Sequence, residues 1–186
     1  MKPLLLFSAM LFLSTVNAAA MERKLFTLEK TYNPQNIMVI HAITDSNCRF
    51  VSRANQYLDF YWLINGNTRK EVHEMIRSTV QERVKFIGIH ANRESFRLTM
   101  NDLKEVDHDL TDKTLEVVSI MSNGICQVKS LLNLGPSGRY RRMDLKRTFC
   151  EVSTNFVGLP NGCKTLELQG VDADTGTPLK VKFKKK

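Results

Sequence analysis

Short apolar segments in which every second residue is hydrophobic follow one another through most of this chain. Residues 96–100 and residues 179–183 show the pattern most regularly. A two-residue period places hydrophobic side chains on one face of a strand. Turn residues separate the segments at the intervals typical of all-β domains. The sequence therefore predicts a mainly β fold, an antiparallel sandwich or barrel of about eight strands.

An aromatic segment at residues 56–66 is the expected centre of this fold. It holds the only tryptophan, Trp62, and an unbroken apolar run at residues 60–64. Aromatic and β-branched residues suit a pleated surface, and Asn65-Gly66 ends the run with turn residues. We expect a strand buried on both faces near its middle, with the core closing over Trp62.

The pair Asn123-Gly124 stands between two apolar runs, residues 114–121 and 125–132. Asn-Gly suits a two-residue hairpin turn because both positions need a positive φ. These residues predict a β-hairpin.

One helix is expected to cover the sheet. Thr68 and Glu71 have the spacing of a capping box, in which each side chain satisfies a free amide of the first turn. Four apolar residues then recur at helical spacing: Val72, Met75, Ile76 and Val80. The pattern predicts a helix from residue 68 to about residue 83, packed on the core.

The first 18 residues have the features of a signal peptide. Lys2 precedes an apolar run at residues 4–13, which is too short to span a bilayer, and residues 16–18 end in a small-x-small site. We expect cleavage after Ala18, with Ala20 as the alternative site. No later segment reaches the length of a membrane helix. Residues 19–186 then form a single β-rich domain with a basic C-terminal tail, periplasmic or secreted from a bacterium.

The chain carries a formal net charge of +8. A basic exported protein is suited to an envelope glycan, a lipid headgroup or another envelope protein as a partner. Two segments concentrate the charge: Arg139, Tyr140, Arg141 and Arg142, and the alternating Lys180, Lys182 and Lys184. Guanidinium groups beside an aromatic ring suit phosphate binding, but in a strand this set splits between the two faces, which favours a solvated rim. The lysines either bind an anionic lipid or polyanion or protect an edge strand from sheet aggregation.

Four cysteines lie beyond the signal segment, at positions 48, 126, 150 and 163. Export permits disulfides, and four cysteines allow three pairings; buried thiols are the alternative. If disulfides form, Cys150 and Cys163 are the expected pair, because a turn lies between them. No Cys-x-x-Cys pair suggests zinc.

His41, His90 and Asp59 are the candidate catalytic residues. The two histidines end apolar strands, and Asp59 lies inside the aromatic strand. Imidazole and carboxylate groups suit acid–base or metal-assisted hydrolysis. Strand-end histidines are also ordinary rim residues, and no motif links the three.

Residues 172–176, Asp-Ala-Asp-Thr-Gly, superficially suggest a calcium loop. The further oxygen ligands of such a loop are missing, and lysines follow instead. The segment predicts a turn, and the sequence predicts neither a metal site nor a cofactor.

Short motifs along the chain resemble, in order and spacing, those of a bacterial family called domain of unknown function 4833. They are Leu25-Phe26, Lys30-Thr31, Asn33, Asn36, the strand at 37–40, Tyr61-Trp62, and the C-terminal segments 165–170 and 172–176. The resemblance covers nearly all of the mature chain and implies an exported β-rich protein without an assigned activity. The four cysteines and the acidic loop expected at residues 101–112 depart from the family pattern.

Together, these features favour a non-enzymatic binding or structural module of the envelope. The alternatives are a hydrolase using His41, His90 and Asp59, and a binder of polyanions or anionic lipids using the two basic segments.

Overall fold

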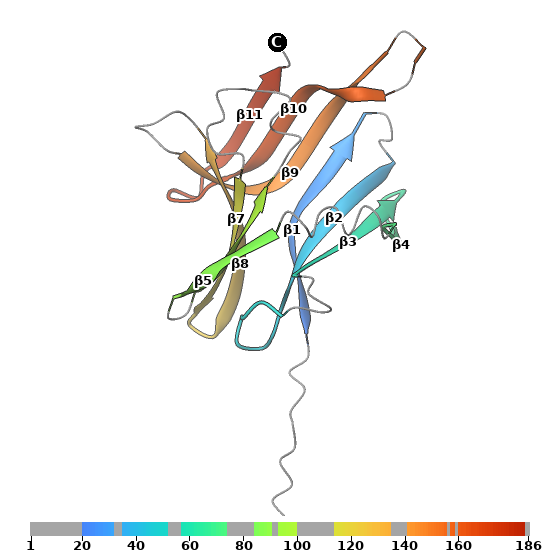
Figure 1. Ribbon diagram of the computed structural model, residues 1–186. Helices are drawn as coiled ribbons and strands as arrows, with labels where there is room; N and C mark the ends of the chain where they lie inside the picture. Colours follow the sequence, from blue (N-terminus) through green and yellow to red (C-terminus); the bar gives the residue numbers. More distant parts are fainter. Residues whose placement is uncertain are drawn as a thin grey trace, which may run out of the picture.

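The structure is a computed structural model of the chain, and its strands form one sheet (Figure 1). It describes residues 20–31, 35–51, 57–73, 84–90, 93–99, 114–134, 141–155, 157–158 and 160–184. The strands are β1 (Met21–Lys30), β2 (Asn36–Thr44), β3 (Leu58–Ile64), β4 (Thr68–Glu71), β5 (Val84–His90), β6 (Arg93–Thr99), β7 (Thr114–Ser122), β8 (Ile125–Leu134), β9 (Arg141–Thr154), β10 (Pro160–Asp172) and β11 (Pro178–Lys184). The expected mainly β fold is confirmed, with eleven strands among the described residues rather than about eight.

The sheet branches at β9. Its strand order is β4-β3-β2-β1-β9-β8-β7-β6-β5, with β10 and then β11 added beside β9. β10 lies along nearly the whole of one edge of β9, while β8 and β1 share the other edge. β8 pairs with the first part of β9, up to Asp144, and β1 pairs with residues 147–150. The order ends at β4 and β5, so the sheet is open among the described residues.

The β1–β9 pair is parallel, and every other strand pair among the described residues is antiparallel. The predicted antiparallel pairing therefore holds for every described strand pair except this one. A parallel pair joins strands that are distant in sequence, and here it joins the first strand to the ninth. Turn signals report only pairs of neighbouring strands, so they do not reveal this contact.

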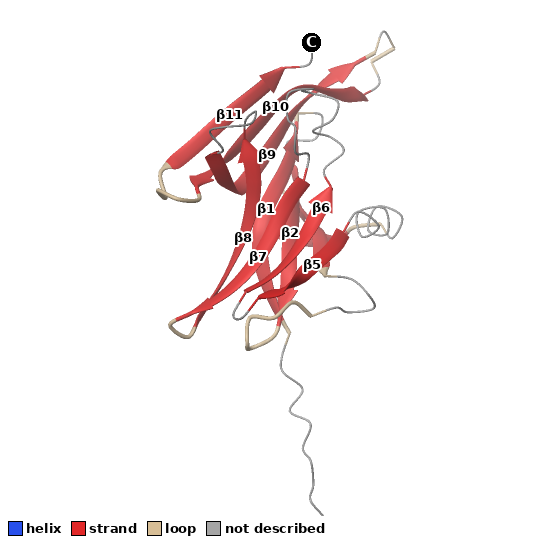
Figure 2. Ribbon diagram, turned by 60° about the vertical axis from the view of Figure 1, so that its left-hand side comes forward, coloured by secondary structure: helices blue, strands red, loops and turns tan. Residues whose placement is uncertain are grey.

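Strands from the two ends of the sheet order share one core. Phe26 and Phe60 belong to the same cluster of buried residues as Phe96 and Leu115. The rings of Phe50 and Phe96 meet edge-on, with centroids 4.8 Å apart. The group β6–β8 therefore faces the group β1–β3 across a shared interior, and Figure 2 shows the two groups one behind the other.

The aromatic segment forms β3, as expected, but it is not buried on both faces. Leu58 and Phe60 are 1% and 2% exposed, whereas Asp59, Tyr61 and Trp62 are half-buried. Trp62 packs against the rim of the core. The reason is position, because β3 has only the four-residue β4 between it and the sheet edge.

The predicted helix is wrong where it can be compared with the structure. Thr68–Glu71 is strand β4, paired antiparallel with β3. Asn65 and Gly66 adopt positive φ and turn the chain straight back, so backbone pairing with β3 replaces the capping box. Thr68 instead donates its hydroxyl hydrogen bond to Asn67 Oδ1, at 3.2 Å. The rest of the predicted helix, residues 74–83, lies outside the described residues, as does the predicted loop at 101–112.

The hairpin predicted around Asn123-Gly124 is confirmed. Both residues have positive φ, and Ser122 of β7 pairs with Ile125 of β8. The alternation predicted for the last strand is also confirmed: Leu179, Val181 and Phe183 pack against the core, while Lys180, Lys182 and Lys184 are exposed.

All four cysteines form disulfides. The Cys150–Cys163 disulfide joins β9 to β10, which confirms the expected pair. The Cys48–Cys126 disulfide joins the loop after β2 to β8. The alternative of buried thiols is therefore wrong. Two disulfides are consistent with an extracytoplasmic protein. Among the described residues, no helix has the length and apolar character needed to cross a membrane.

Candidate functional site

The structure brings together two of the three predicted catalytic residues. His41 of β2 and Asp59 of β3 are direct cross-strand partners. His90 ends β5, which stands at the far end of the strand order and, of the described strands, pairs with β6 alone. The His90 side chain lies outside the described part of the structure, so its participation stays a prediction.

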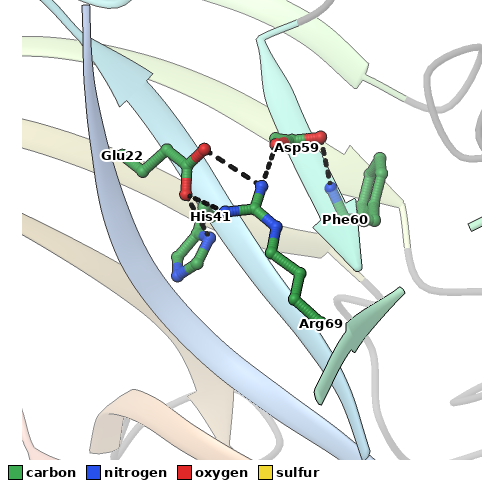
Figure 3. Close-up of polar contacts among 5 residues, drawn as sticks. All are labelled: Glu22, His41, Asp59, Phe60 and Arg69. Atoms are coloured by element: carbon green, nitrogen blue, oxygen red, sulfur yellow. Dashed lines mark hydrogen bonds and ion pairs between the residues drawn. The ribbon is translucent and has the colours of Figure 1, made fainter. Parts of the chain in front are cut away.

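Arg69 of β4 links the two carboxylates nearest to His41 (Figure 3). Its guanidinium donates to both oxygens of Glu22 on β1, each at 3.0 Å, and to Asp59 Oδ2 at 3.0 Å. The hydrogen bond to Glu22 raises the pKa of Arg69 above its ordinary value. The Arg69 side chain of β4 therefore connects β1 to β3 across the intervening strand β2.

His41 lies beneath this ion pair and is 7% exposed. Its Nδ1 is 3.5 Å from Glu22 Oε2, but the contact lacks hydrogen-bond geometry, so the buried nitrogen has no hydrogen-bond partner. Burial lowers the pKa of His41, while the nearby Glu22 carboxylate opposes the shift. His41 is therefore neutral at pH 7.

Tyr61 completes the cover over His41. The Arg69 guanidinium carbon lies 4.1 Å from the centre of the Tyr61 ring, and the Tyr61 and His41 rings are 5.1 Å apart. Arg69 thus makes a cation–π contact with Tyr61 and ion pairs with two carboxylates. Each contact helps to hold the guanidinium in place for the others. Here Arg69 binds Glu22 and Asp59 above His41, and these contacts brace strands β1–β4.

A pocket opens on the other face of β3. It has a volume of about 590 Å³ and is lined by Asn36, Trp62, Ile64, Lys70, Glu71, Val72 and His73. Pockets of this size hold small molecules. The sequence predicted Trp62 only as a core residue, and it did not reveal the pocket because the β3–β4 hairpin, predicted as strand and helix, assembles the lining.

The basic segments lie elsewhere on the sheet. The ammonium group of Lys180 is 2.9 Å from Glu167 Oε1 across the β10–β11 pair, while Arg142 donates to Asp174 at 3.0 Å. Arg141 is exposed, and Arg139 and Tyr140 lie outside the described residues. The lysine row (Lys180, Lys182 and Lys184) is thus a solvent-facing feature of an edge strand.

Arg147 and Glu29 form a further ion pair that was not predicted from the sequence. Arg147 of β9 binds Glu29 of β1 through two nitrogens, with Nε at 2.8 Å from Oε1. The hydrogen bond from Arg147 lowers the pKa of Glu29. It spans the parallel pair, so no local motif signals it.

The segment weighed as a calcium loop forms a turn. Asp172 Oδ1 accepts hydrogen bonds from the backbone amides of Asp174 and Thr175, at 3.0 and 2.9 Å. These bonds lower the pKa of Asp172. Among the described residues, no group of three or more His, Cys, Asp or Glu side chains is placed to hold a metal ion.

The chain has no match among protein-family models, curated proteins or solved structures.

Proposed function

We propose that this protein is an exported, sandwich-like envelope module that binds a ligand in the Trp62 pocket without converting it chemically. The observation that carries the proposal is the pocket itself, in which an aromatic side chain and polar residues from β2 and β4 line one hollow. A concave site with a few polar groups is the usual form of a small-molecule site. The two disulfides and the expected signal peptide support export. The resemblance to domain of unknown function 4833 supports an envelope location.

The contacts around His41 favour binding over hydrolysis. A general base needs a path to the proton that it removes, but His41 is buried under Glu22, Arg69 and Tyr61. Asp59 accepts from Arg69 on one oxygen and from the Phe60 amide on the other, at 3.0 and 2.9 Å. Both groups have structural partners that a catalytic step would have to displace.

The test uses Trp62, the only tryptophan of the chain, as a reporter. The fluorescence emission of Trp62 and the melting temperature of the protein are recorded in the presence of neutral oligosaccharides, polyanions, anionic vesicles, fatty acids and short peptides. We expect one class of compound to change the emission, raise the melting temperature and be recovered intact by mass spectrometry.

Two outcomes would contradict this proposal. The first is turnover of a compound that is lost in His41→Gln or Asp59→Asn, which would assign a hydrolase. The second is polyanion or vesicle binding that leaves Trp62 emission unchanged and disappears when Lys180, Lys182 and Lys184 are replaced by Gln. That result would move the function to the lysine row, whereas increased light scattering alone in this variant would assign those lysines to edge protection.

A further inference from the structure

Two rows of cross-strand partners form the floor and the rims of the Trp62 pocket. In the first row, Met38 of β2 pairs with Trp62 of β3, and Trp62 pairs with Lys70 of β4. In the second row, Asn36 of β2 pairs with Ile64 of β3. Cross-strand partners project from the same face of a sheet. The indole and the Ile64 side chain are therefore flanked by an amide on the β2 side and an ammonium group on the β4 side.

The segment after β4 forms another wall of the pocket. Val72 is 4% exposed and belongs to the core, so it anchors this wall. Glu71 precedes it and His73 follows it, and both line the pocket. The lining thus combines an apolar floor with hydrogen-bond donors and acceptors around it.

The charges of the lining restrict the ligand. Lys70 and Glu71 are adjacent and opposite in charge, and neither forms an ion pair within the described part of the chain. The lining includes one basic and one acidic residue, so its formal charges balance and it favours neither a strongly anionic nor a cationic ligand. A purely apolar ligand removes water from Lys70 and the Asn36 amide without replacing their hydrogen bonds, which is costly. A neutral molecule rich in hydroxyl groups satisfies both the polar rim and the apolar floor.

Pyranose rings have this combination of surfaces. Their axial C–H bonds form an apolar face that suits an aromatic ring, and the hydroxyl groups around the rim both donate and accept hydrogen bonds. We propose that the pocket binds one pyranose unit of a neutral oligosaccharide, with the apolar sugar face on Trp62 and hydroxyl groups bound to Asn36 and Lys70. The inference rests on the proposed function, because it names the ligand class of the same pocket.

The experiment titrates the protein with cellotetraose and chitotetraose, and follows Trp62 emission together with isothermal calorimetry. We expect both methods to report binding with the same affinity. Replacing Asn36 or Lys70 by Ala removes one hydrogen bond and should weaken binding about tenfold, since 1.4 kcal/mol corresponds to a factor of ten. Lys182→Ala is the matched control, an exposed β11 lysine that should leave the affinity unchanged, and each variant should keep the parent melting temperature.

The result distinguishes this inference from the proposed function. If only fatty acids or peptides change Trp62 emission, the saccharide inference is overturned and the binding function stands. If no compound changes it, both are overturned. Saccharide binding that persists in Asn36→Ala and Lys70→Ala, or that leaves Trp62 emission unchanged, places the sugar elsewhere and also overturns the inference.

Discussion

Buried charged residues in this domain are tied to backbone amides. Glu94 is 7% exposed, and its Oε2 accepts the amide of Phe50 at 2.7 Å. Asp144 is 5% exposed; it accepts the amide of Ser130 at 2.9 Å and pairs with Lys146. Buried charges persist where such bonds replace those to water. His41 differs, because its buried Nδ1 has no hydrogen-bond partner.

His41 should make the protein less stable in mild acid. Its folded pKa is lowered mainly by burial, so the unfolded chain, titrating near 6.5, binds the proton first. Stability is then full above pH 6.5 and falls as the pH drops towards the folded pKa, by at most about 1.4 kcal/mol per pH unit. Urea unfolding at pH 7.5 and 5.5 measures the loss.

The variant His41→Phe keeps a ring beside Tyr61 and removes the titrating group. We expect a smaller loss of stability between the two pH values in this variant. Glu22, Lys24, Asp59 and Arg69 are the charged groups acting on His41, and all of them remain in the variant. An equal loss in the two proteins would show that His41 does not control the acid response.

At the scale of strands, the sequence predicted local pairing well and distant pairing poorly. The Asn123-Gly124 hairpin and the alternation in β11 follow from neighbouring residues, and both are confirmed. The helix start predicted at residues 68–71 was wrong because the Asn65-Gly66 turn brought β4 back onto β3. The capping-box spacing depends only on residues 68–71 themselves. Their structure also depends on the edge of β3, which is available for pairing.

Gly170 shows how closely β9 and β10 approach. It lies at a register shift of their ladder, opposite Leu145. A Cβ at this position would stand 2.2 Å from the carbonyl oxygen of Asp144 and 2.8 Å from Met143 Cγ. Because backbone has to move, Gly170→Ala should destabilise by about 1–3 kcal/mol in urea unfolding, as overpacking does.

The neighbouring Gln169→Ala is the control for this substitution. The Gln169 side chain is half-buried and hydrogen-bonds Glu167, so its loss should cost about 0.5 kcal/mol or less. Equal stability of the Gly170→Ala variant and the parent would mean that the two strands are further apart than the structure shows.

At the scale of the whole molecule, the Cys48–Cys126 disulfide joins the two facing groups of strands. It closes a loop between residues 78 positions apart, compared with 13 positions for Cys150–Cys163. Chain entropy predicts stabilisation of about 4.5 kcal/mol for the longer loop and about 3 kcal/mol for the shorter. The double variant Cys48→Ser/Cys126→Ser should therefore unfold at a lower urea concentration than Cys150→Ser/Cys163→Ser. The reverse order would indicate that the strand groups associate without their covalent link.

The candidate sites show the same limit of sequence reasoning. His41 and Asp59 were singled out separately, and only the β2–β3 register makes them partners. The Trp62 pocket draws on β2, β3, β4 and the residues after β4. Its polar members have no common spacing in the sequence, because sheet pairing alone places Asn36 and Lys70 on the face that carries Trp62.

The parallel β1–β9 pair also sets an order of events during biosynthesis. Arg147 and its partner Glu29 are 118 positions apart, so β1 leaves the ribosome long before the strand that covers its free edge. Until then β1 can pair only with β2, and its other edge has no strand partner. Contacts between segments so distant in sequence form slowly. For a chain threaded through a membrane from its N-terminus, β9 is the strand whose arrival lets the first half of the domain finish folding.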